Sequence, residues 1–244
     1  MRGKVLLGAA AALAAAALLP AASALARPVF YNESFESGLG IWGPSGFNGN
    51  PIQVTQSNTT ASDGTFSMKV TQDGQGFSWN TKAEGNSTNL NALYQGFNNV
   101  STLPENQVFI EFDVIYHHAD IPDNGNFMNM SVYINNDNGF RQVDSLALDD
   151  GAHIQGNIDQ TIHVAIPISS FGGFGDKIPT NANFYQLGWS MNGDWGAGNG
   201  TAGDGIGDAS VYYDHVQITA VPEPATMGLA ALGLGAMALR RRRA

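Results

Sequence analysis

The sequence contains no cysteine, so disulfide bonds cannot stabilise the protein. Small exported domains often depend on such bonds. Without them, the fold must be held by a hydrophobic core or by a bound metal ion. Residues 27–220 are long enough to bury one sizeable core, and a second domain is not required.

Positive charge is scarce in the middle of the chain. Between Arg27 and Ala220 there are five basic and twenty acidic residues, a net charge of −15. Nucleic acid and anionic lipid headgroups would be repelled by such a surface. We therefore exclude nucleic acid as a partner of this region.

Long segments of helical periodicity are also missing, and two-residue alternation is present instead. In Val108–Tyr116 and again in residues 128–135, apolar residues alternate with polar ones such as Glu111 and Asp113. This pattern is typical of strands with one buried face. We therefore expect an all-β fold, a two-sheet jelly-roll β-sandwich over residues 27–220. The other predicted strands are Phe30–Phe35, Ile52–Gln56, Phe66–Thr71, Phe77–Lys82, Ala92–Phe97, Phe140–Leu146, Gln160–Ile166, Tyr185–Met191 and Val211–Ala220.

The N-terminal 26 residues have the composition of an export signal. Arg2 and Lys4 precede an Ala/Leu-rich run, and small residues follow as far as Ala26. That order is typical of a cleavable signal peptide, and it predicts a mature chain that starts near Arg27.

The C-terminal segment, residues 221–244, has three parts in order: a Pro-Glu-Pro motif, an apolar run and a basic end. These parts are Pro222, Glu223 and Pro224; residues 225–239; and Arg240, Arg241, Arg242 and Arg243. As a helix the apolar run would reach about 22 Å, short of the ~30 Å hydrocarbon core, so it would be a marginal anchor. The arginines would hold its far end in the cytoplasm and leave the main domain outside.

This segment resembles the PEP-CTERM sorting signal of bacterial proteins. The resemblance implies recognition by an exosortase, a membrane protease or transpeptidase, and transient attachment to the membrane through the C-terminal helix. Because this signal is associated with bacteria that produce exopolysaccharide, we expect the final location to be the cell surface or the extracellular matrix. The alternative is an ordinary C-terminal membrane anchor.

Three stretches of the middle region are similar to jelly-roll carbohydrate-binding modules of the galactose-binding-like type. They are Asn32–Gly38 with Trp42, Ala61–Val70 and Val211–Ile218. In such modules the first and last strands commonly carry a structural calcium ion. The resemblance makes Glu36, Asp63 and Asp214 the candidate ligands, with backbone carbonyls completing the oxygen shell.

The position of Asp214 gives a physical reason for a cation. Asp214 alternates with Tyr212, Val216 and Ile218, which predicts that it points to the same buried side. A buried carboxylate is costly unless it is hydrogen-bonded, paired or bound to a cation. The alternative is that backbone amides or a tyrosine hydroxyl satisfy it.

Sugar recognition by a β-sandwich generally requires exposed aromatic rings and neighbouring hydrogen-bonding groups. Trp195 stands in a glycine-rich loop that cannot easily bury it. Each of the other aromatic candidates could instead belong to the core. The predicted ligand-binding residues are Trp79, Tyr94, Trp189, Asp194 and Trp195.

An enzyme is the second hypothesis. Residues 111–116 resemble the catalytic strand of jelly-roll glucanases, in which two Glu and one Asp share a strand face. Here Glu111 and Asp113 are present, but Tyr116 stands near the place of the second Glu, so the acid/base role is unfilled. We therefore expect a non-enzymatic, calcium-stabilised glycan-binding protein. The alternatives are a secreted glycoside hydrolase or polysaccharide lyase, and a purely structural surface protein without a ligand.

Overall fold

The computed structural model describes residues 27–44, 53–72, 81–88, 91–120, 128–149, 159–171, 182–193 and 209–221. Residues Val29–Ala220 form one compact unit. The predicted signal peptide, the apolar run at 225–239 and the terminal arginines lie outside the described residues. Among the residues that are described, no helix is long and apolar enough to cross a membrane.

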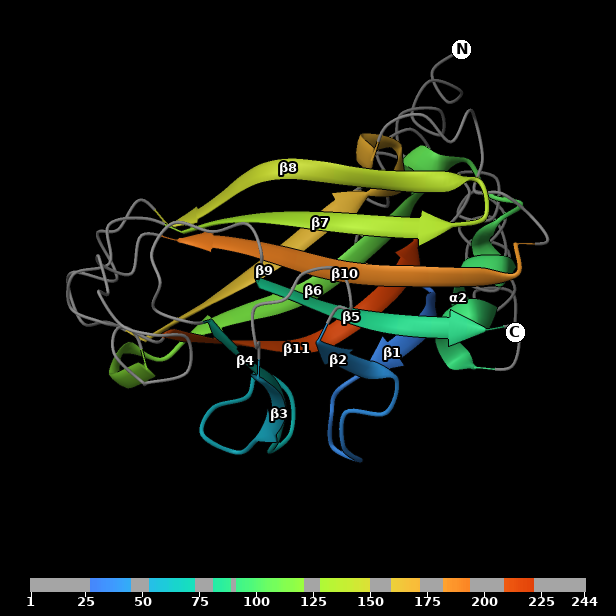
Figure 1. Ribbon diagram of the computed structural model, residues 1–244. Coiled ribbons are helices and arrows are strands. Elements are labelled where there is room, and N and C mark those ends of the chain that lie inside the picture. Colours follow the sequence, from blue (N-terminus) through green and yellow to red (C-terminus); the bar gives the residue numbers. More distant parts are fainter. Residues whose placement is uncertain are drawn as a thin grey trace, which may run out of the picture. The chain divides into compact units, whose positions relative to one another are not determined.

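This unit is built of two antiparallel sheets, which lie as two layers in Figure 1. Sheet A has the order β3-β4-β11-β6-β9, and β1 also pairs with β11. Its strands are β1 (Val29–Glu33), β3 (Gln53–Ser57), β4 (Ser67–Gln72), β6 (Val108–Tyr116), β9 (Gln160–Pro167) and β11 (Ala209–Ala220). Sheet B has the order β2-β5-β10-β7-β8. Its strands are β2 (Trp42–Pro44), β5 (Thr81–Thr88), β7 (Met128–Asn136), β8 (Gly139–Asp149) and β10 (Phe184–Gly193).

The prediction of a two-sheet β-sandwich is confirmed. Strand β6 has the predicted bounds, and its residues Ile110, Phe112, Val114 and Tyr116 are all buried in the core. Met130, Val132 and Ile134 of β7 face the same core from sheet B. Alternation therefore assigned the inner faces of β6 and β7 correctly, because a strand with one buried face needs apolar residues at every second position.

One predicted strand is wrong: residues 92–97 belong to helix α2 (Ala92–Val100). Leu93, Phe97 and Val100 recur at helical spacing and are buried. Asn91 caps the helix, because its side chain accepts a hydrogen bond of 3.0 Å from the backbone N–H of Tyr94. The segment is short enough that its apolar residues were compatible with either period. The remaining helical turns are η2 (Glu105–Gln107), η3 (His118–Asp120) and η4 (Ile168–Phe171).

Stacked aromatic rings join the two sheets at the centre of the core. Trp189 of β10 stacks on Trp42 at 4.7 Å between ring centroids and on Tyr213 of β11 at 4.9 Å. Phe112 of β6 meets Trp189 edge-on at 5.3 Å. Both sheets are therefore packed on one indole ring, which is 1% exposed.

Strand β11 changes its inward face part-way along. Val211 and Tyr213 point into the core before Asp214, whereas Val216 and Ile218 do so after it. The register against β6 shifts by one residue between Asp214 and Gln217, which defines a β-bulge. Asp214 therefore shares the outer face with Tyr212 and not the core face of Val216 and Ile218. That part of the prediction is wrong, because simple alternation cannot anticipate an inserted residue.

Candidate functional site

Asp214 is fully buried and lies where the loop between β3 and β4 crosses β11. Its Oδ2 atom accepts hydrogen bonds from the backbone N–H of Ser62 at 2.8 Å and of Asp63 at 2.9 Å. Its Oδ1 atom accepts a bond of 2.7 Å from the N–H of His215. Burial raises the pKa of Asp214, and these hydrogen bonds oppose that effect only in part. These three backbone hydrogen bonds agree with the alternative given in the sequence analysis, in which backbone amides satisfy the buried carboxylate.

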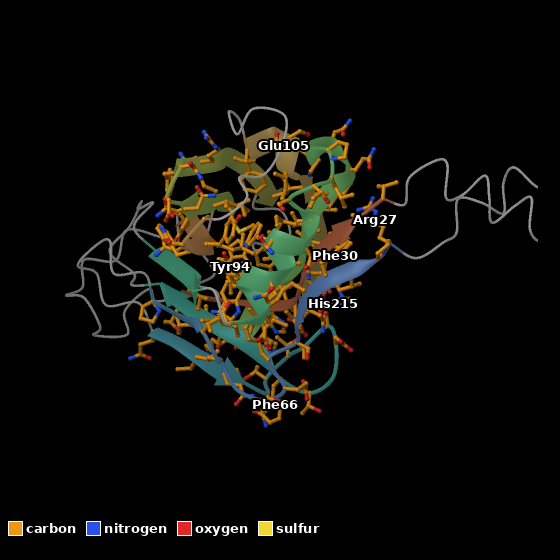
Figure 2. The ribbon with its side chains drawn as sticks, turned by 90° about the vertical axis from the view of Figure 1, so that its right-hand side faces the viewer. Arg27, Phe30, Phe66, Tyr94, Glu105 and His215 are labelled. Atoms are coloured by element: carbon orange, nitrogen blue, oxygen red, sulfur yellow. The ribbon has the colours of Figure 1, made fainter. Side chains whose placement is uncertain are left out.

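Glu36 holds the other side of the same loop. Its Oε1 atom accepts hydrogen bonds of 2.7 Å from the backbone N–H groups of both Thr65 and Phe66; Phe66 is labelled in Figure 2. Asp63, by contrast, is exposed and contributes its backbone N–H to Asp214. The fold thus gathers the three predicted ligands around one loop, with Glu36 and Asp214 bracing its backbone.

Sequence reasoning missed Glu33, the last residue of β1, which belongs to this junction. Its Oε1 atom accepts a hydrogen bond of 3.0 Å from the N–H of Phe35. Burial raises the pKa of Glu33, and the nearby negative charge of Asp214 adds to the rise. The signal was available, because Glu33 precedes Glu36 in the stretch that carries the jelly-roll resemblance.

The backbone at this junction is unusual. Phe35 has φ of 58° and His215 has φ of 51°, and these are the non-glycine residues with positive φ within the described ranges. Such conformations cost about 1–3 kcal/mol each and persist only where the surroundings enforce them. They change the direction of the backbone two residues after Glu33 and directly after Asp214. In the part of the chain that the structure describes, no group of three acidic, histidine or cysteine side chains could hold a metal ion, so a cation here would need backbone carbonyls as well.

Trp189 and Tyr94 are the predicted ligand-binding aromatics within the described residues, and they do not share one surface. Trp189 is buried between Trp42 and Tyr213, so neither face of its ring is open to a sugar, and its assignment as a ligand-binding residue is wrong. Tyr94 lies half-buried on α2 (Figure 2), where its hydroxyl donates a bond of 2.8 Å to the carbonyl of Ala182. Trp79, Asp194 and Trp195 lie outside the described residues and stay predictions.

A different aromatic pair lies on the outer face of sheet B, the face turned away from the core. Tyr133 of β7 stacks on Phe140 of β8 at 5.3 Å between ring centroids. Phe140 is 52% exposed, although aromatic side chains of this size are usually buried. The alternation of β7 could have found this pair, since it places Tyr133 among the polar residues Ser131 and Asn135.

Amide side chains continue from this pair across the sheet. Asn135 is the strand neighbour of Phe140 and also of Gln186 on β10. The Asn135 amide donates a bond of 2.6 Å to the carbonyl oxygen of the Gln186 side chain. Two residues further along the strands, Tyr133 is the neighbour of Gly188 on β10. Glycine leaves that position of the sheet without a side chain. The outer face thus exposes the ring of Phe140 beside two half-buried amides, whereas Tyr133 and Gly188 are buried.

The outer face of sheet A has a different chemistry. Asp113 on β6 is 2.7 Å from Nδ1 of His163 on β9, and Glu111 is 3.5 Å from Nε2 of the same ring. Thr219 donates a hydrogen bond to Glu111, and His215 lies 3.8 Å from Asp113. The acidic pair singled out from the sequence is therefore engaged by neighbouring side chains.

The geometry of β6 does not support the glucanase resemblance. Its pairing with β9 runs without a bulge from Phe109 to Tyr116. Glu111 and Asp113 consequently face outward, whereas Tyr116 faces the core and is 1% exposed. Even a carboxylate at position 116 would point into the core, away from Glu111 and Asp113. This strand therefore does not place three carboxylates on one face.

Comparison with known proteins gives one sequence match. Residues 220–243 match the PEP-CTERM protein-sorting motif, so the chain carries a C-terminal signal for export and sorting. A search of curated proteins gave no match.

Among solved structures, the chain is similar to carbohydrate-binding modules with β-sandwich folds. A C-terminal family 22 module from Clostridium thermocellum has 16% identity and a TM-score of 0.41, over 80% of this chain and 96% of that one. A CBM22-1 xylan-binding domain from Paenibacillus barcinonensis has 14% identity and a TM-score of 0.44, over 81% and 97%. A CBM28 module specific for non-crystalline cellulose has 12% identity and a TM-score of 0.47, over 77% and 93%.

Proposed function

We propose that this is an exported, non-catalytic glycan-binding protein that binds polysaccharide on the outer face of sheet B. The observation that carries the proposal is the exposed ring of Phe140, stacked on Tyr133 and flanked by the Asn135–Gln186 amide pair. A rigid aromatic face can stack on the apolar face of a sugar ring, and amides can pair with hydroxyl groups.

The chemistry of this face favours a neutral glycan. The side chains of β7, β8 and β10 that the structure describes as exposed or half-buried on this face are Asn135, Phe140, Gln142 and Gln186. All of them are uncharged and capable of hydrogen bonding or stacking. With a net charge of −15 over residues 27–220, the domain would repel polysaccharides rich in acidic sugars.

Replacing Phe140 tests the proposal. The Phe140→Ala variant of the mature protein should bind neutral polysaccharide about tenfold more weakly, since that factor corresponds to ~1.4 kcal/mol and a ring contact is worth about that much. Titration calorimetry over a panel of neutral and acidic polysaccharides gives the affinities. Val29→Ala is the matched control, because Val29 is equally exposed, at 51%, but lies on sheet A. Equal affinities for wild type and Phe140→Ala would exclude this face as the site.

We also propose a structural calcium ion at the junction of β1 and β11. Two carboxylates with raised pKa, Glu33 and Asp214, share this junction, and a divalent cation would relieve both their burial and their repulsion. These two would be the principal side-chain ligands, with Glu36, Asp63 and backbone carbonyls as further candidates. Bound calcium would neutralise charge and join the chain ends where a disulfide is absent. Calcium should raise the melting temperature and chelator should lower it; identical melting curves would exclude the ion.

The C-terminal signal completes the proposal. We infer that a membrane protease of the exosortase type recognises residues 221–244 after transient membrane insertion of residues 225–239, and delivers the domain to the cell surface or extracellular matrix. The match at residues 220–243 and the basic end support this assignment. In a host that makes such an enzyme, the mature protein should lack the arginine tail. Retention of the tail on the surface-exposed protein would contradict it and favour an ordinary anchor.

A further inference from the structure

The turn that joins β7 to β8 (Figure 1) carries an Asn-Gly pair, Asn138 and Gly139, directly before Phe140. Asp137, Asn138, Gly139 and Phe140 are all exposed. The amide carbon of an asparagine side chain can be attacked by the backbone nitrogen of the next residue. A side chain on that next residue hinders the attack, and glycine has none. Sequence and exposure together therefore make Asn138 open to an intramolecular reaction.

The surroundings of Gly139 leave room for this reaction. Gly139 has φ of 125°, and apart from its chain neighbours no atom lies within 4 Å of the position that a Cβ would take. The backbone N–H of Asn138 donates a hydrogen bond of 2.8 Å to Oδ1 of Asn136. Among the described residues, nothing forms a hydrogen bond with the Asn138 side chain. Its amide group is thus free to turn toward the nitrogen of Gly139.

The attacking nitrogen belongs to the last rung of the β7–β8 ladder, where Gly139 is the strand neighbour of Asn136. This rung must open before the nitrogen can react. Opening at the exposed end of a hairpin needs little free energy, because few buried contacts are lost. Asn183 is the internal comparison. It is also exposed, but its side-chain nitrogen donates a bond of 2.6 Å to Asp137, and the next residue, Phe184, carries a bulky side chain.

We propose that Asn138 is a site of spontaneous deamidation, and that its products weaken glycan binding on the outer face of sheet B. The second half of this inference rests on the proposed function. In the first step the nitrogen of Gly139 forms a bond to Cγ of Asn138. The bond from Cγ to the side-chain nitrogen breaks, and that nitrogen leaves as ammonia with the proton that Gly139 gives up. A succinimide ring remains in the backbone.

Water completes the reaction. It adds to one of the two carbonyl carbons of the succinimide, and the bond from that carbon to the ring nitrogen breaks. Breaking the bond to the side-chain carbon leaves an aspartate, whereas breaking the bond to the backbone carbon leaves an isoaspartate. The whole reaction consumes one water molecule and releases one ammonia molecule, and it requires no other reagent.

Both products alter the glycan face beside Phe140. Aspartate adds a negative charge to the turn. Isoaspartate also inserts one carbon atom into the backbone, because the chain then runs through Cβ and Cγ of residue 138. The turn fixes the register in which Asn135 is the strand neighbour of Phe140. A longer turn would displace the Phe140 ring from Tyr133, on which it stacks, and should weaken binding several-fold.

Peptide mapping by mass spectrometry measures the reaction in the full-length protein, kept folded in mildly alkaline buffer. We expect a deamidated fraction at Asn138 that grows with time, and an intact amide at Asn183. Fragmentation that separates aspartate from isoaspartate identifies the products. An Asn138 that keeps its amide throughout would overturn the inference, whatever happens at the other Asn-Gly pairs of the chain.

Titration calorimetry on fresh and aged protein measures the consequence for binding. The aged wild type should bind neutral polysaccharide several-fold more weakly than the fresh protein. Asn138→Gln is the matched control, because its longer side chain closes the ring far more slowly, and ageing should leave its affinity unchanged. Asn138→Asp reproduces the charge without the longer backbone, so it should weaken binding less than ageing does.

Two outcomes separate this inference from the proposed function. Deamidation at Asn138 without loss of affinity, in a protein that Phe140→Ala still weakens, would overturn the effect on binding and leave the glycan face intact. If Phe140→Ala binds as tightly as the wild type, the glycan face itself is wrong, and the effect on binding is overturned with it. The deamidation measured by peptide mapping stands or falls independently of both.

Discussion

The two sheets have equivalent inner faces but different outer faces. On sheet A the outward side chains include charged groups that pair with one another, as in the contact of His163 with both Asp113 and Glu111. On sheet B the outward side chains that the structure describes as exposed or half-buried are uncharged and include the ring of Phe140. A charged group already paired within the protein has little to offer a neutral ligand, whereas an exposed aromatic ring can stack on a sugar. This difference is the reason for proposing that glycan binds to sheet B, whereas sheet A joins the first and last strands of the domain.

The largest effect should come from the residue on which both sheets pack. Trp189→Ala removes an indole in contact with Trp42, Tyr213 and Phe112, and should lower the free energy of unfolding by about 3–5 kcal/mol. Urea unfolding followed by circular dichroism measures the loss. If this variant were as stable as the wild type and lost only glycan binding, Trp189 would belong to the ligand site and not to the core.

The loop braced by Glu36 and Asp214 gives the next effect. Gly64 has φ of 73°, and an added Cβ would lie 2.5 Å from Oε1 of Glu36, so Gly64→Ala should destabilise the domain by about 1–3 kcal/mol. Gly139→Ala, at φ of 125° with open space around it, isolates the backbone strain on the sheet B side. Gly43→Ala is the control, because it adds neither backbone strain nor a close contact. Thermal melting should rank the variants in that order, and equal losses for Gly64 and Gly139 would show that contact with Glu36 is unimportant.

Replacing one amide side chain on each sheet compares the two outer faces directly. Asn135→Ala on sheet B should weaken polysaccharide binding by about 1 kcal/mol, because a hydrogen-bonding group beside Phe140 is lost. Gln217→Ala on sheet A, whose side chain contacts Asn32 and His215, should leave affinity unchanged. Calorimetry on both variants measures the difference. Equal weakening would mean that the ligand contacts both sheets.

The smallest effect concerns pH and sheet A alone. Burial pushes the pKa of Asp120 upward, but hydrogen bonds from Tyr212 and Lys69 outweigh it, so this pKa lies below its ordinary value. A pKa that is lower in the folded than in the unfolded chain gives stability that is complete above about pH 3.9 and is lost as the pH falls through the folded value.

Because Asp120 is partly exposed, this contribution should be roughly 0.5–1 kcal/mol. Comparing urea unfolding of Asp120→Asn and wild type at neutral and at strongly acidic pH isolates it from the other acids. The two proteins should differ at neutral pH and converge in acid. A difference that stays constant with pH would contradict the assigned ion pair with Lys69.

Much of the fold followed from short-range patterns. Alternation placed β6, β7 and β11 within a few residues and identified Phe112 and Val132 as core. It failed at residues 92–97, where Leu93 and Phe97 fit a helix as well as a strand. It also failed beyond Asp214, where a bulge changes the inward face of β11. The candidate site was less predictable, because exposure of an aromatic depends on what packs against it.

The sequence alone determined that this protein has an acidic, disulfide-free β-sandwich and a C-terminal sorting signal. Charge, cysteine content, period-two alternation and the order of the terminal motifs are all properties of neighbouring residues. Only the tertiary structure decided that Trp189 is core while Phe140 is exposed, and that Glu33 joins Asp214. Those outcomes depend on contacts between segments far apart in the chain, and no local pattern of residues encodes them.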